Sequence, residues 1–478
     1  MFRSRKKSAR LDAKRLSSRS RVRRSAFERL EDRRLLAAEI VWVGPNNGAW
    51  SQASHWNLGR VPAATDDVVI PSVAGDQNIN FSSGTVSVNS ITLAERLTLT
   101  GGSLQVTGSV AGGNVSGSGV VQLSSGALRT AVLSATTQLV TAGGTLSGVT
   151  VNGTFTVNRG ALTINSGLTL NGAMAVGSAD GNINGNVSFS GTQTLAGTGT
   201  ITFGGSASNS FNLTGSGTTT LTIGSGITIQ GIAGGITEPT RGTNSLVNQG
   251  TLNVPEGGDF KIGGNTWRNL GTINVDRGTI RLDGAFKSSD LGTFNASTGT
   301  VHVTGVMDNA GSTFTLQPSL GGDWRLSGGT ILGGTIAAAS GQSIVLTRDG
   351  GTLDGVTTTA TIDGTRATGT WNRNSLTVKN GLTVNNTMRL GNTAGTIYTT
   401  VTLNGTQTLG GTGTVTFGGS TSNSMTAVGI GSGQTMTLTI GPQITIDAGA
   451  GSLGDDVWNA TGTEVIVNRG TIRVGIGA

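Results

Sequence analysis

The sequence predicts an all-β protein, a parallel β-helix (β-solenoid) of short Gly/Thr/Asn-rich strand repeats, and three observations predict it. First, apolar and polar residues alternate in short runs along most of the chain, as in TVSVNSITL from Thr85 to Leu93. Second, Gly, Asn or Ser separates these runs, and 80 of the 478 residues are Gly. Third, related segments recur along the chain. Period-two alternation buries one strand face, and Gly and Asn tolerate the positive φ of tight corners.

Other repeat folds fit this sequence less well. An immunoglobulin-like sandwich packs modules of about 100 residues around aromatic side chains, whereas aromatic residues make up 4% of this chain. A propeller repeats its blades every ~40–50 residues, and the sequence shows no such period. The motif Asn248-Gln-Gly-Thr recurs as Asn269-Leu-Gly-Thr. If that spacing is one coil, residues 73–478 predict roughly 19 coils.

In addition to the short repeats, the sequence contains a longer duplicated segment. GTQTLAGTGTITFGGSASNS begins at Gly191, and GTQTLGGTGTVTFGGSTSNS begins at Gly405; 17 of the 20 positions match. The offset between these two segments is 214 positions. Further upstream, Gly143-Gly-Thr-Leu recurs as Gly350-Gly-Thr-Leu at an offset of 207 positions, so a seven-residue insertion restores the register. The duplicated block therefore covers about 143–230 and 350–446.

The net charge of +7 comes from the N-terminus. Residues 1–36 hold 14 Lys/Arg and 4 Asp/Glu, whereas the remainder holds 18 basic and 21 acidic residues. Nucleic-acid binding by the folded part would require a clustered basic face, and we expect none after residue 36. A nucleic-acid-binding arm within residues 1–36 remains an alternative to a solvated basic tail.

Residues 1–38 form a basic leader with a recognisable motif at its end. They resemble the N-terminal sorting motif of large repetitive surface proteins of planctomycete-type bacteria, in which a Phe precedes Leu-Glu-Pro-Arg-x-Leu-Leu. The matching residues are Phe27, Leu30, Glu31, Arg33, Leu35 and Leu36, and Asp32 stands where the family has proline. The resemblance implies export or surface attachment, with this segment as a sorting or processing signal. The apolar stretch of an ordinary secretory signal is absent.

Residues 39–72 differ from the repeats because they are rich in Trp. Trp42, Trp50 and Trp56 lie in this segment. It resembles the opening segment of autotransporter-type and haemagglutinin-like β-helical passenger proteins, and Trp50, Trp56-Asn57, Gly59, Pro62, Asp67 and Ile70 carry the match. The resemblance implies a secreted or surface-exposed β-helix. A solenoid end needs a cap, and we expect the three Trp side chains to plug it; a sugar-stacking platform is the alternative. Val467–Val474 is another repeat without a comparable cap, which predicts either a fragment or an end that self-associates.

The sequence offers little for catalysis or metal binding. It has no Cys, and its two His, at 55 and 302, lack metal-ligand spacing. Asp180-Gly-Asn-Ile-Asn-Gly185 resembles the front of a calcium loop, but Gly191 stands where a bidentate acid is needed, so we expect a polar turn. Asp66-Asp67 and Asp455-Asp456 are adjacent pairs that would point to opposite strand faces. We predict no catalytic, cofactor-binding or metal-binding residue.

These observations favour a non-enzymatic, exported or cell-surface protein with a structural or adhesive role. The first alternative is a polysaccharide-binding or polysaccharide-modifying β-helix, and the second is nucleic-acid binding through the leader. The expected partners are surface polysaccharides or other cell-surface proteins. No cofactor is expected. No membrane span is expected either, because the sequence lacks an apolar run long enough to cross a bilayer.

Overall fold

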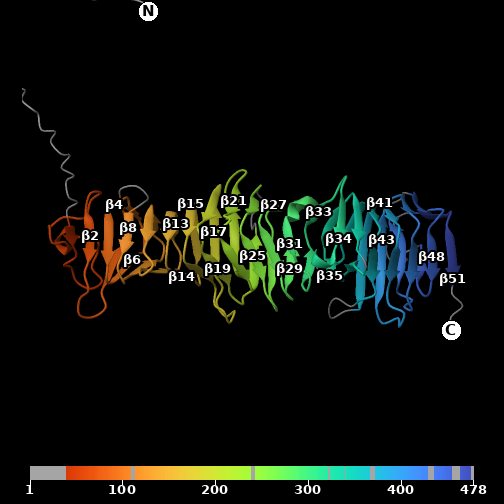
Figure 1. Ribbon diagram of the computed structural model, residues 1–478, viewed down its shortest axis with the longest axis horizontal. Helices are drawn as coiled ribbons and strands as arrows, with labels where there is room; N and C mark the ends of the chain where they lie inside the picture. The colour runs from red at the N-terminus through yellow and green to blue at the C-terminus, as the bar shows by residue number, and fades with distance from the viewer. Residues whose placement is uncertain are drawn as a thin grey trace, which may run out of the picture. The chain divides into compact units, whose positions relative to one another are not determined.

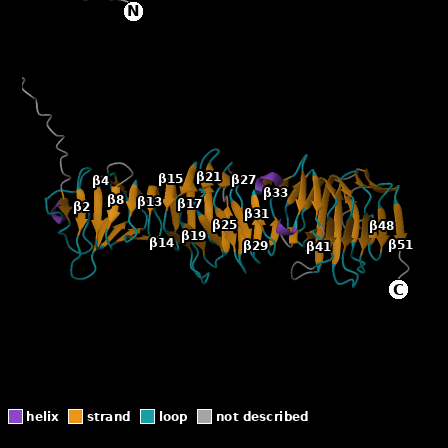
Figure 2. Ribbon diagram, viewed as in Figure 1, coloured by secondary structure: helices purple, strands orange, loops and turns teal. Residues whose placement is uncertain are grey.

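The computed structural model describes residues 39–108, 113–237, 243–320, 323–339, 341–366, 372–428, 435–454 and 463–474. The chain divides into two units, residues 1–37 and 38–478, and the described residues all belong to the second. This unit is a β-solenoid of about 17 turns, which confirms the predicted fold class. Figure 1 shows its coils stacked in chain order, and Figure 2 shows that strands joined by short loops make up nearly all of it.

Three stacks of parallel strands form the solenoid, and the chain visits them in the same order in every coil. The first stack contains β4 (Thr85–Val88), β7 (Ser103–Val106), β10 (Ala127–Arg129), β17 (Asn186–Ser190), β20 (Ser210–Thr214), β23 (Ala233–Thr237), β26 (Asp259–Ile262), β29 (Thr279–Leu282), β32 (Thr300–Val303), β35 (Asp323–Leu326), β38 (Ser343–Leu346), β40 (Thr361–Gly364), β42 (Thr387–Leu390), β45 (Thr414–Phe417), β48 (Thr445–Ala448) and β51 (Thr471–Val474).

The second stack contains β1 (Glu39–Val41), β2 (Asp67–Ile70), β5 (Ser90–Leu93), β8 (Gly113–Ser116), β11 (Ala131–Leu133), β18 (Gln193–Ala196), β21 (Thr220–Ile223), β24 (Ser245–Asn248), β27 (Thr266–Asn269), β30 (Ala285–Lys287), β33 (Val306–Asp308), β36 (Thr330–Leu332), β43 (Tyr398–Asn404), β46 (Ser424–Val428) and β49 (Ser452–Leu453).

The third stack runs in two parts, from β3 to β31 and from β34 onward. It contains β3 (Asn78–Phe81), β6 (Arg96–Leu99), β9 (Val120–Leu123), β12 (Gln138–Thr141), β14 (Thr154–Val157), β16 (Ala173–Val176), β19 (Thr200–Phe203), β22 (Thr228–Gly231), β25 (Thr251–Val254), β28 (Thr272–Val275), β31 (Thr293–Asn295), β34 (Thr313–Leu316), β37 (Thr335–Ala338), β44 (Gln407–Gly410), β47 (Thr435–Ile440) and β50 (Thr463–Asn468).

Four longer strands bend around a corner, so that each contributes to two stacks: β13 (Thr145–Val151), β15 (Ala161–Leu170), β39 (Thr352–Thr358) and β41 (Arg373–Val384). The first halves of β13 and β15 belong to the first stack and their second halves to the second stack, whereas β39 and β41 join the second and third stacks. The helical segments in the described residues are three short 3₁₀ turns, η1 (Ala53–His55), η2 (Ser288–Leu291) and η3 (Pro318–Leu320).

The alternating pattern produces the core directly. In β28, Ile273 and Val275 are buried and Thr272 and Asn274 face outward. Parallel pairing aligns Ile273 with Leu252 of the preceding coil, so inward side chains stack in rows along the axis while backbone groups pair with the coils on either side. Because each coil buries its apolar face against its neighbours, stability accumulates from coil to coil.

Coil length varies more than the sequence motif suggests. Thr251 aligns with Thr272, and Thr272 aligns with Thr293, so both intervals equal that of the repeated Asn-x-Gly-Thr motif. Ala173, however, aligns with Thr200, and Thr200 with Thr228, which are clearly longer intervals. Loops between strands account for the extra residues. Because of these loops the chain forms about 17 turns, fewer than the roughly 19 coils predicted from a uniform coil of the motif's length.

The two copies of the duplicated block occupy different stacks. Leu162 and Leu376 are equivalent positions of the two copies, yet Leu162 lies in the first stack and Leu376 in the second. The following halves of β15 and β41 show the same step, from the second stack to the third. Nine strands of the first stack, β17 to β40, separate β15 from β41, so the second copy lies nine turns and a third beyond the first.

The corner within β15 is stabilised by one buried side chain. Ser166 and Gly167 have φ values of 56° and 85°, which form a sharp bend. Gln193 fits beneath it, accepting a hydrogen bond from the Gly167 amide (3.1 Å) and donating to the carbonyl oxygens of Ile164 and Ser190 (both 2.9 Å).

The equivalent corner in β41 repeats this arrangement. Asn380 and Gly381 have φ values of 53° and 88°. The Gln407 side chain accepts from the Gly381 amide (3.0 Å) and donates to the carbonyl oxygens of Val378 (2.8 Å) and Asn404 (2.5 Å). The bend and its hydrogen bonds therefore belong to the local sequence, whichever two stacks the strand joins.

Removing one complete coil should leave a folded solenoid. Deletion of residues 251–271 joins Gly250 to Thr272, which then takes the register position of Thr251. Because coil energies are roughly additive between neighbours, we expect an unchanged β-sheet circular dichroism spectrum and a Tm lowered by only a few degrees. Deletion of 251–260 removes about half a coil and shifts every later strand to a different stack, so this control should aggregate. Equal behaviour of the two deletions would contradict the stacked-coil register.

Candidate functional site

The structure brings together the three Trp residues of the N-terminal segment. Trp42, Trp50 and Trp56 are all buried, and Trp56 meets both of the others edge-on, with ring centroids 5.0 Å from Trp42 and 4.8 Å from Trp50. The Trp56 indole N–H donates to the Trp50 carbonyl oxygen (2.9 Å). Trp50 also contacts Phe81 of β3 (5.8 Å between centroids). Because the rings pack on one another, they leave no open face on which a sugar could stack.

The rest of that motif forms a turn held by an ion pair between Arg60 and Asp66, which the sequence alone did not predict. Pro62 is buried and Gly59 adopts a φ of 62°. Asp66 is buried beside them and accepts hydrogen bonds from Arg60 (2.5 and 2.8 Å) and from the Ala63 amide (2.7 Å). The Arg60 hydrogen bond is the main reason that the pKa of Asp66 lies below its ordinary value.

Asp67, the motif residue next to Asp66, points the other way along β2. It accepts hydrogen bonds from Asn89 (2.7 Å) and Ser90 (2.5 Å) of the next coil. The adjacent carboxylates therefore act separately, as strand geometry requires. The leader residues Phe27, Leu30, Glu31, Arg33, Leu35 and Leu36, and the pair Asp455-Asp456, lie outside the described residues.

The loop at Asp180 is a polar turn between β16 and β17. Its carboxylate accepts hydrogen bonds from the amide and side chain of Asn182 (3.1 and 2.6 Å) and from the Ser178 hydroxyl. These hydrogen bonds, chiefly that of Ser178, hold the pKa of Asp180 below its ordinary value. Within the part of the chain that the structure describes, no group of three or more His, Asp or Glu side chains could hold a metal ion.

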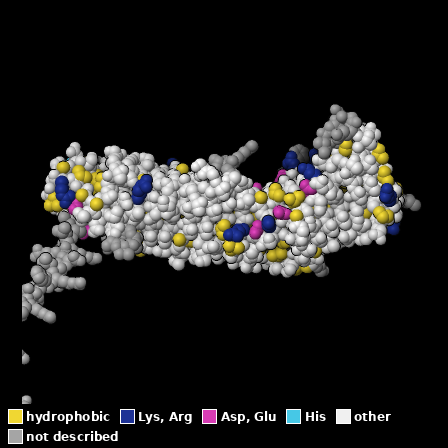
Figure 3. Space-filling view, turned by 90° about the horizontal axis from the view of Figure 1, so that it is seen from above, with side chains coloured by type: hydrophobic (Ala, Val, Ile, Leu, Met, Phe, Trp, Pro, Cys, Tyr) yellow, Lys and Arg dark blue, Asp and Glu magenta, His cyan; other side chains and the backbone are white. Residues whose placement is uncertain are grey.

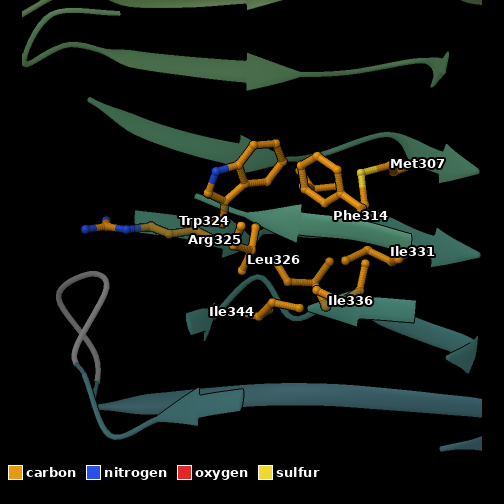
Figure 4. A pocket seen from close by; sticks show the side chains of 10 residues that line it. Met307, Phe314, Trp324, Arg325, Leu326, Ile331, Ile336 and Ile344 are labelled. Carbon is orange, nitrogen blue, oxygen red and sulfur yellow. The ribbon is translucent and has the colours of Figure 1, made fainter. Parts of the chain in front are cut away.

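Two hollows differ in kind. The first is a cavity of about 10 Å³ inside the solenoid, between Trp324, Phe314, Met307 and neighbouring aliphatic side chains; Figure 4 shows these side chains converging from several strands. A cavity of this size could hold one water at most, and its apolar walls offer too few polar partners, so it is a packing defect. The second is an open hollow of about 460 Å³ at β12 and β14, lined mainly by uncharged polar side chains.

Charged residues of the solenoid concentrate in one segment, which we name the charged belt and define as residues 256–389. It contains 10 acidic and 11 basic residues. Residues 97–237 contain three charged residues, Arg129, Arg159 and Asp180, and residues 390–454 contain one, Asp447. Figure 3 shows charged side chains of both signs gathered toward the middle of the solenoid, around a hollow in its outline.

Within the belt, the first stack carries four nitrogen-bearing side chains in register, which we name the basic column: Lys261, Arg281, His302 and Arg325. Cα pairing aligns each with the next, on β26, β29, β32 and β35. The expectation that no basic residues cluster after residue 36 is therefore wrong as to clustering, although Asp283, Asp259 and Asp323 accompany the three cations. Each sequence interval between successive members of the column equals the length of one coil, so the fold brings the four side by side.

Carboxylates fix the orientation of the column. Arg281 donates through Nε and Nη2 to both oxygens of Asp259 (2.7 Å each), and Arg325 donates to Asp323 (3.2 Å). Lys261 Nζ lies 3.4 Å from Asp283. Arg366 holds Asp323 from the other side (2.6 Å) and also pairs with Asp363 (2.9 Å), which connects β35 with β40. Paired groups of this kind are pre-oriented for polar ligands.

His302 lies half-buried between the two arginines. Its Nδ1 is 2.9 Å from the Ser327 hydroxyl. Burial, with Arg281 and Arg325 on either side, lowers the pKa of His302 to about 4, although Asp259 and Asp349 act in the opposite direction. The imidazole is therefore neutral at pH 7. The alternation in Val301-His-Val303 places His302 on the outward face of the strand. It does point outward, but neighbouring coils cover much of it.

The low pKa of His302 should make stability depend on pH. Since the unfolded-state pKa is about 6.5, the unfolded chain binds a proton between pH 6.5 and 4 that the folded chain does not. Stability is therefore fully present above pH 6.5 and falls as the pH drops toward 4, by up to about 3 kcal/mol. The difference in unfolding free energy between wild type and His302→Gln, measured with urea at steps from pH 7.5 to 4, should follow this curve. A pH-independent difference would contradict it.

Comparisons of the chain with family models, with curated proteins and with solved structures found no match. None of the helices that the structure describes has the length and apolar character needed to span a bilayer.

Proposed function

We propose that this protein is a non-enzymatic, exported or cell-surface scaffold, a solenoid that carries a surface over many coils rather than enclosing one reaction site. The observation that carries the proposal is how its outward side chains are used. On the third stack, Asn274 donates to Asn253 (2.8 Å) and Asn295 donates to Asn274 (2.9 Å), each across one coil. These amides bond to one another, so they stiffen the surface instead of presenting single converging groups.

Hydrogen bonds between side chains of successive coils also occur outside the row of Asn253, Asn274 and Asn295. Asn248 donates to Asn269 (2.7 Å), and Asn269 donates to the Leu291 carbonyl oxygen (2.8 Å), at buried positions between β24, β27 and η2. Buried amides that are fully bonded add rigidity and fix one register. Such bonding from coil to coil supports a mechanical or display role.

Export is the second part of the proposal and rests on the leader. The residues Phe27 to Leu36 resemble a surface-sorting motif, and the Trp segment resembles the start of exported β-helices. Removal of the leader would leave a solenoid with a charge of about −3, close to neutral and suited to neither DNA nor RNA.

The intact mass of the native protein in each cell fraction tests this proposal. We expect a surface or medium form cleaved close to Ala38, so that it lacks the leader. A full-length form confined to the cytosol would overturn export, and salt-sensitive retention on DNA that disappears on deletion of residues 1–38 would then favour the leader as a nucleic-acid-binding arm.

A further inference from the structure

The basic column is the feature that the scaffold role does not explain. Outward positions elsewhere on the first stack are mostly Thr, Ser or Asn, as in β17 and β45. On β26, β29, β32 and β35 they change to Lys261, Arg281, His302 and Arg325, with one nitrogen-bearing side chain per coil. Val345 of β38 takes the next position and is buried, so the column ends there. Strand spacing of ~4.8 Å makes it roughly 14 Å long.

The column keeps donors to spare despite its carboxylate partners. A guanidinium has five N–H donors. Asp259 occupies Nε and Nη2 of Arg281, which leaves Nη1 to donate elsewhere. Asp323 accepts from Nη2 of Arg325. The Nε of Arg325 is buried without a hydrogen-bond partner, so the donors of Arg325 that can meet a surface ligand lie on its two terminal nitrogens. The carboxylates therefore orient the guanidinium groups without saturating them.

We propose that the basic column binds one chain of an acidic polysaccharide laid along the solenoid axis, with one carboxylate or sulfate group of the glycan facing each coil. Arg281 and Arg325 each donate to the anionic group that faces their own coil, and Lys261 extends the row by one coil. His302, whose Nδ1 already faces Ser327, offers Nε2 to the group between the arginines. This inference goes beyond the scaffold role and does not depend on the export route.

Geometry distinguishes this ligand from other anions. A single small anion would occupy one coil, whereas the column repeats at the strand spacing, which is close to the length of one extended sugar residue. Each strand of duplex DNA presents one phosphate for about every 3.4 Å of helix axis, a denser charge than the column offers. Asp259, Asp283 and Asp323 lie beside the column and would repel phosphates spaced this closely. A polyanion with more widely spaced charges can align them with the cations.

Binding should also change the titration of His302. The charged groups that face its imidazole are Arg281, Arg325, Asp259 and Asp349. An anion placed between the two arginines offsets their repulsion of a protonated imidazole, so the pKa of His302 should rise when the glycan binds. By linkage, a sulfated glycan, whose anionic groups stay ionised throughout, should then bind more tightly as the pH falls from 6 to 4.

The test uses the full chain and three probes: polygalacturonate, uncharged dextran and a DNA duplex. Calorimetric titration should show that Arg281→Gln/Arg325→Gln binds polygalacturonate at least tenfold more weakly than wild type. The control Arg268→Gln/Arg277→Gln removes the same charge from exposed positions outside the column, and should stay within about twofold. Comparing two variants that both keep the basic leader removes its contribution, and matching melting curves would show that both fold.

A second readout locates the ligand. The His302 imidazole signal, followed by NMR from pH 7 to 3.5, should shift its midpoint upward with polygalacturonate and remain unchanged with dextran. Equal weakening in the two double variants, or an unchanged midpoint, would overturn the proposal. A midpoint shift as large with the DNA duplex would overturn the assignment to a glycan. Because these readouts concern binding, they can fail while the mass and fractionation results stand.

Discussion

Replacing Gly305 by alanine should destabilise the centre of the solenoid by about 3 kcal/mol. A Cβ at this position would collide with backbone atoms of Gly284 and Asp283 in the preceding coil. Those atoms cannot turn aside as a side chain would. The same backbone carries two interstrand hydrogen bonds, from the Gly305 amide to Leu282 (2.9 Å) and from the Val306 amide to Gly284 (2.7 Å). The two coils must therefore separate, which weakens hydrogen bonding on both sides.

Gly410→Ala provides the matched control. A Cβ there meets only the Thr383 hydroxyl, at an ordinary 3.6 Å, and the equivalent position in the first copy of the block is already Ala196. We expect a change within about 0.5 kcal/mol. Hydrogen exchange should show faster opening around β29 to β33 for Gly305→Ala and normal protection for Gly410→Ala. Equal protection in both variants would mean that adjacent coils are not as close as the structure places them.

Gln193→Leu and Gln407→Leu should each cost about 3 kcal/mol and should cost the same amount, because either substitution leaves buried backbone groups unpaired at a corner. Each side chain makes three hydrogen bonds that the leucine cannot make. A buried polar group left unpaired costs about 1–3 kcal/mol. The more specific expectation is that the two losses of unfolding free energy are equal, because the two corners join different pairs of stacks yet carry the same hydrogen bonds.

Gln249→Leu makes the same chemical change at an exposed position and should be nearly neutral. Because the two corners are far apart in the solenoid, the double variant Gln193→Leu/Gln407→Leu should show additive losses. Urea titration and hydrogen exchange at each corner would measure them. A loss at one corner only would show that the surrounding stack, rather than the local sequence, determines the bend.

The fold could be predicted because its cause is local. Leu221-Thr-Ile223 and Leu438-Thr-Ile440 alternate inward and outward positions within a few residues, and both are strands with buried Leu and Ile side chains. The Trp segment was likewise conspicuous in composition. Neither feature depends on where the residues lie around the axis.

The basic column could not be predicted in this way because its cause is cumulative. Which residues share a row depends on the summed lengths of all the loops between them. Aligned positions are much closer in sequence for Thr145 and Thr163 than for Thr200 and Thr228. A search for charges near one another in sequence misses Arg281, His302 and Arg325. A search at the interval of the repeated Asn-x-Gly-Thr motif, allowing for small differences in loop length, would have found them.

The two copies of the block differ in position by a third of a turn beyond whole turns, so the duplicated sequence block is not a whole number of the coils that repeat in the structure. A duplicated stretch of gene was accommodated although it does not correspond to a whole number of coils, because the three sides accept the same β-strand sequences. Lengthening by recombination is therefore open to many breakpoints. The same step prevents a surface feature encoded in the block from lining up with its own duplicate: the second copy faces another direction around the axis, and a partner touching both would have to wrap around the solenoid.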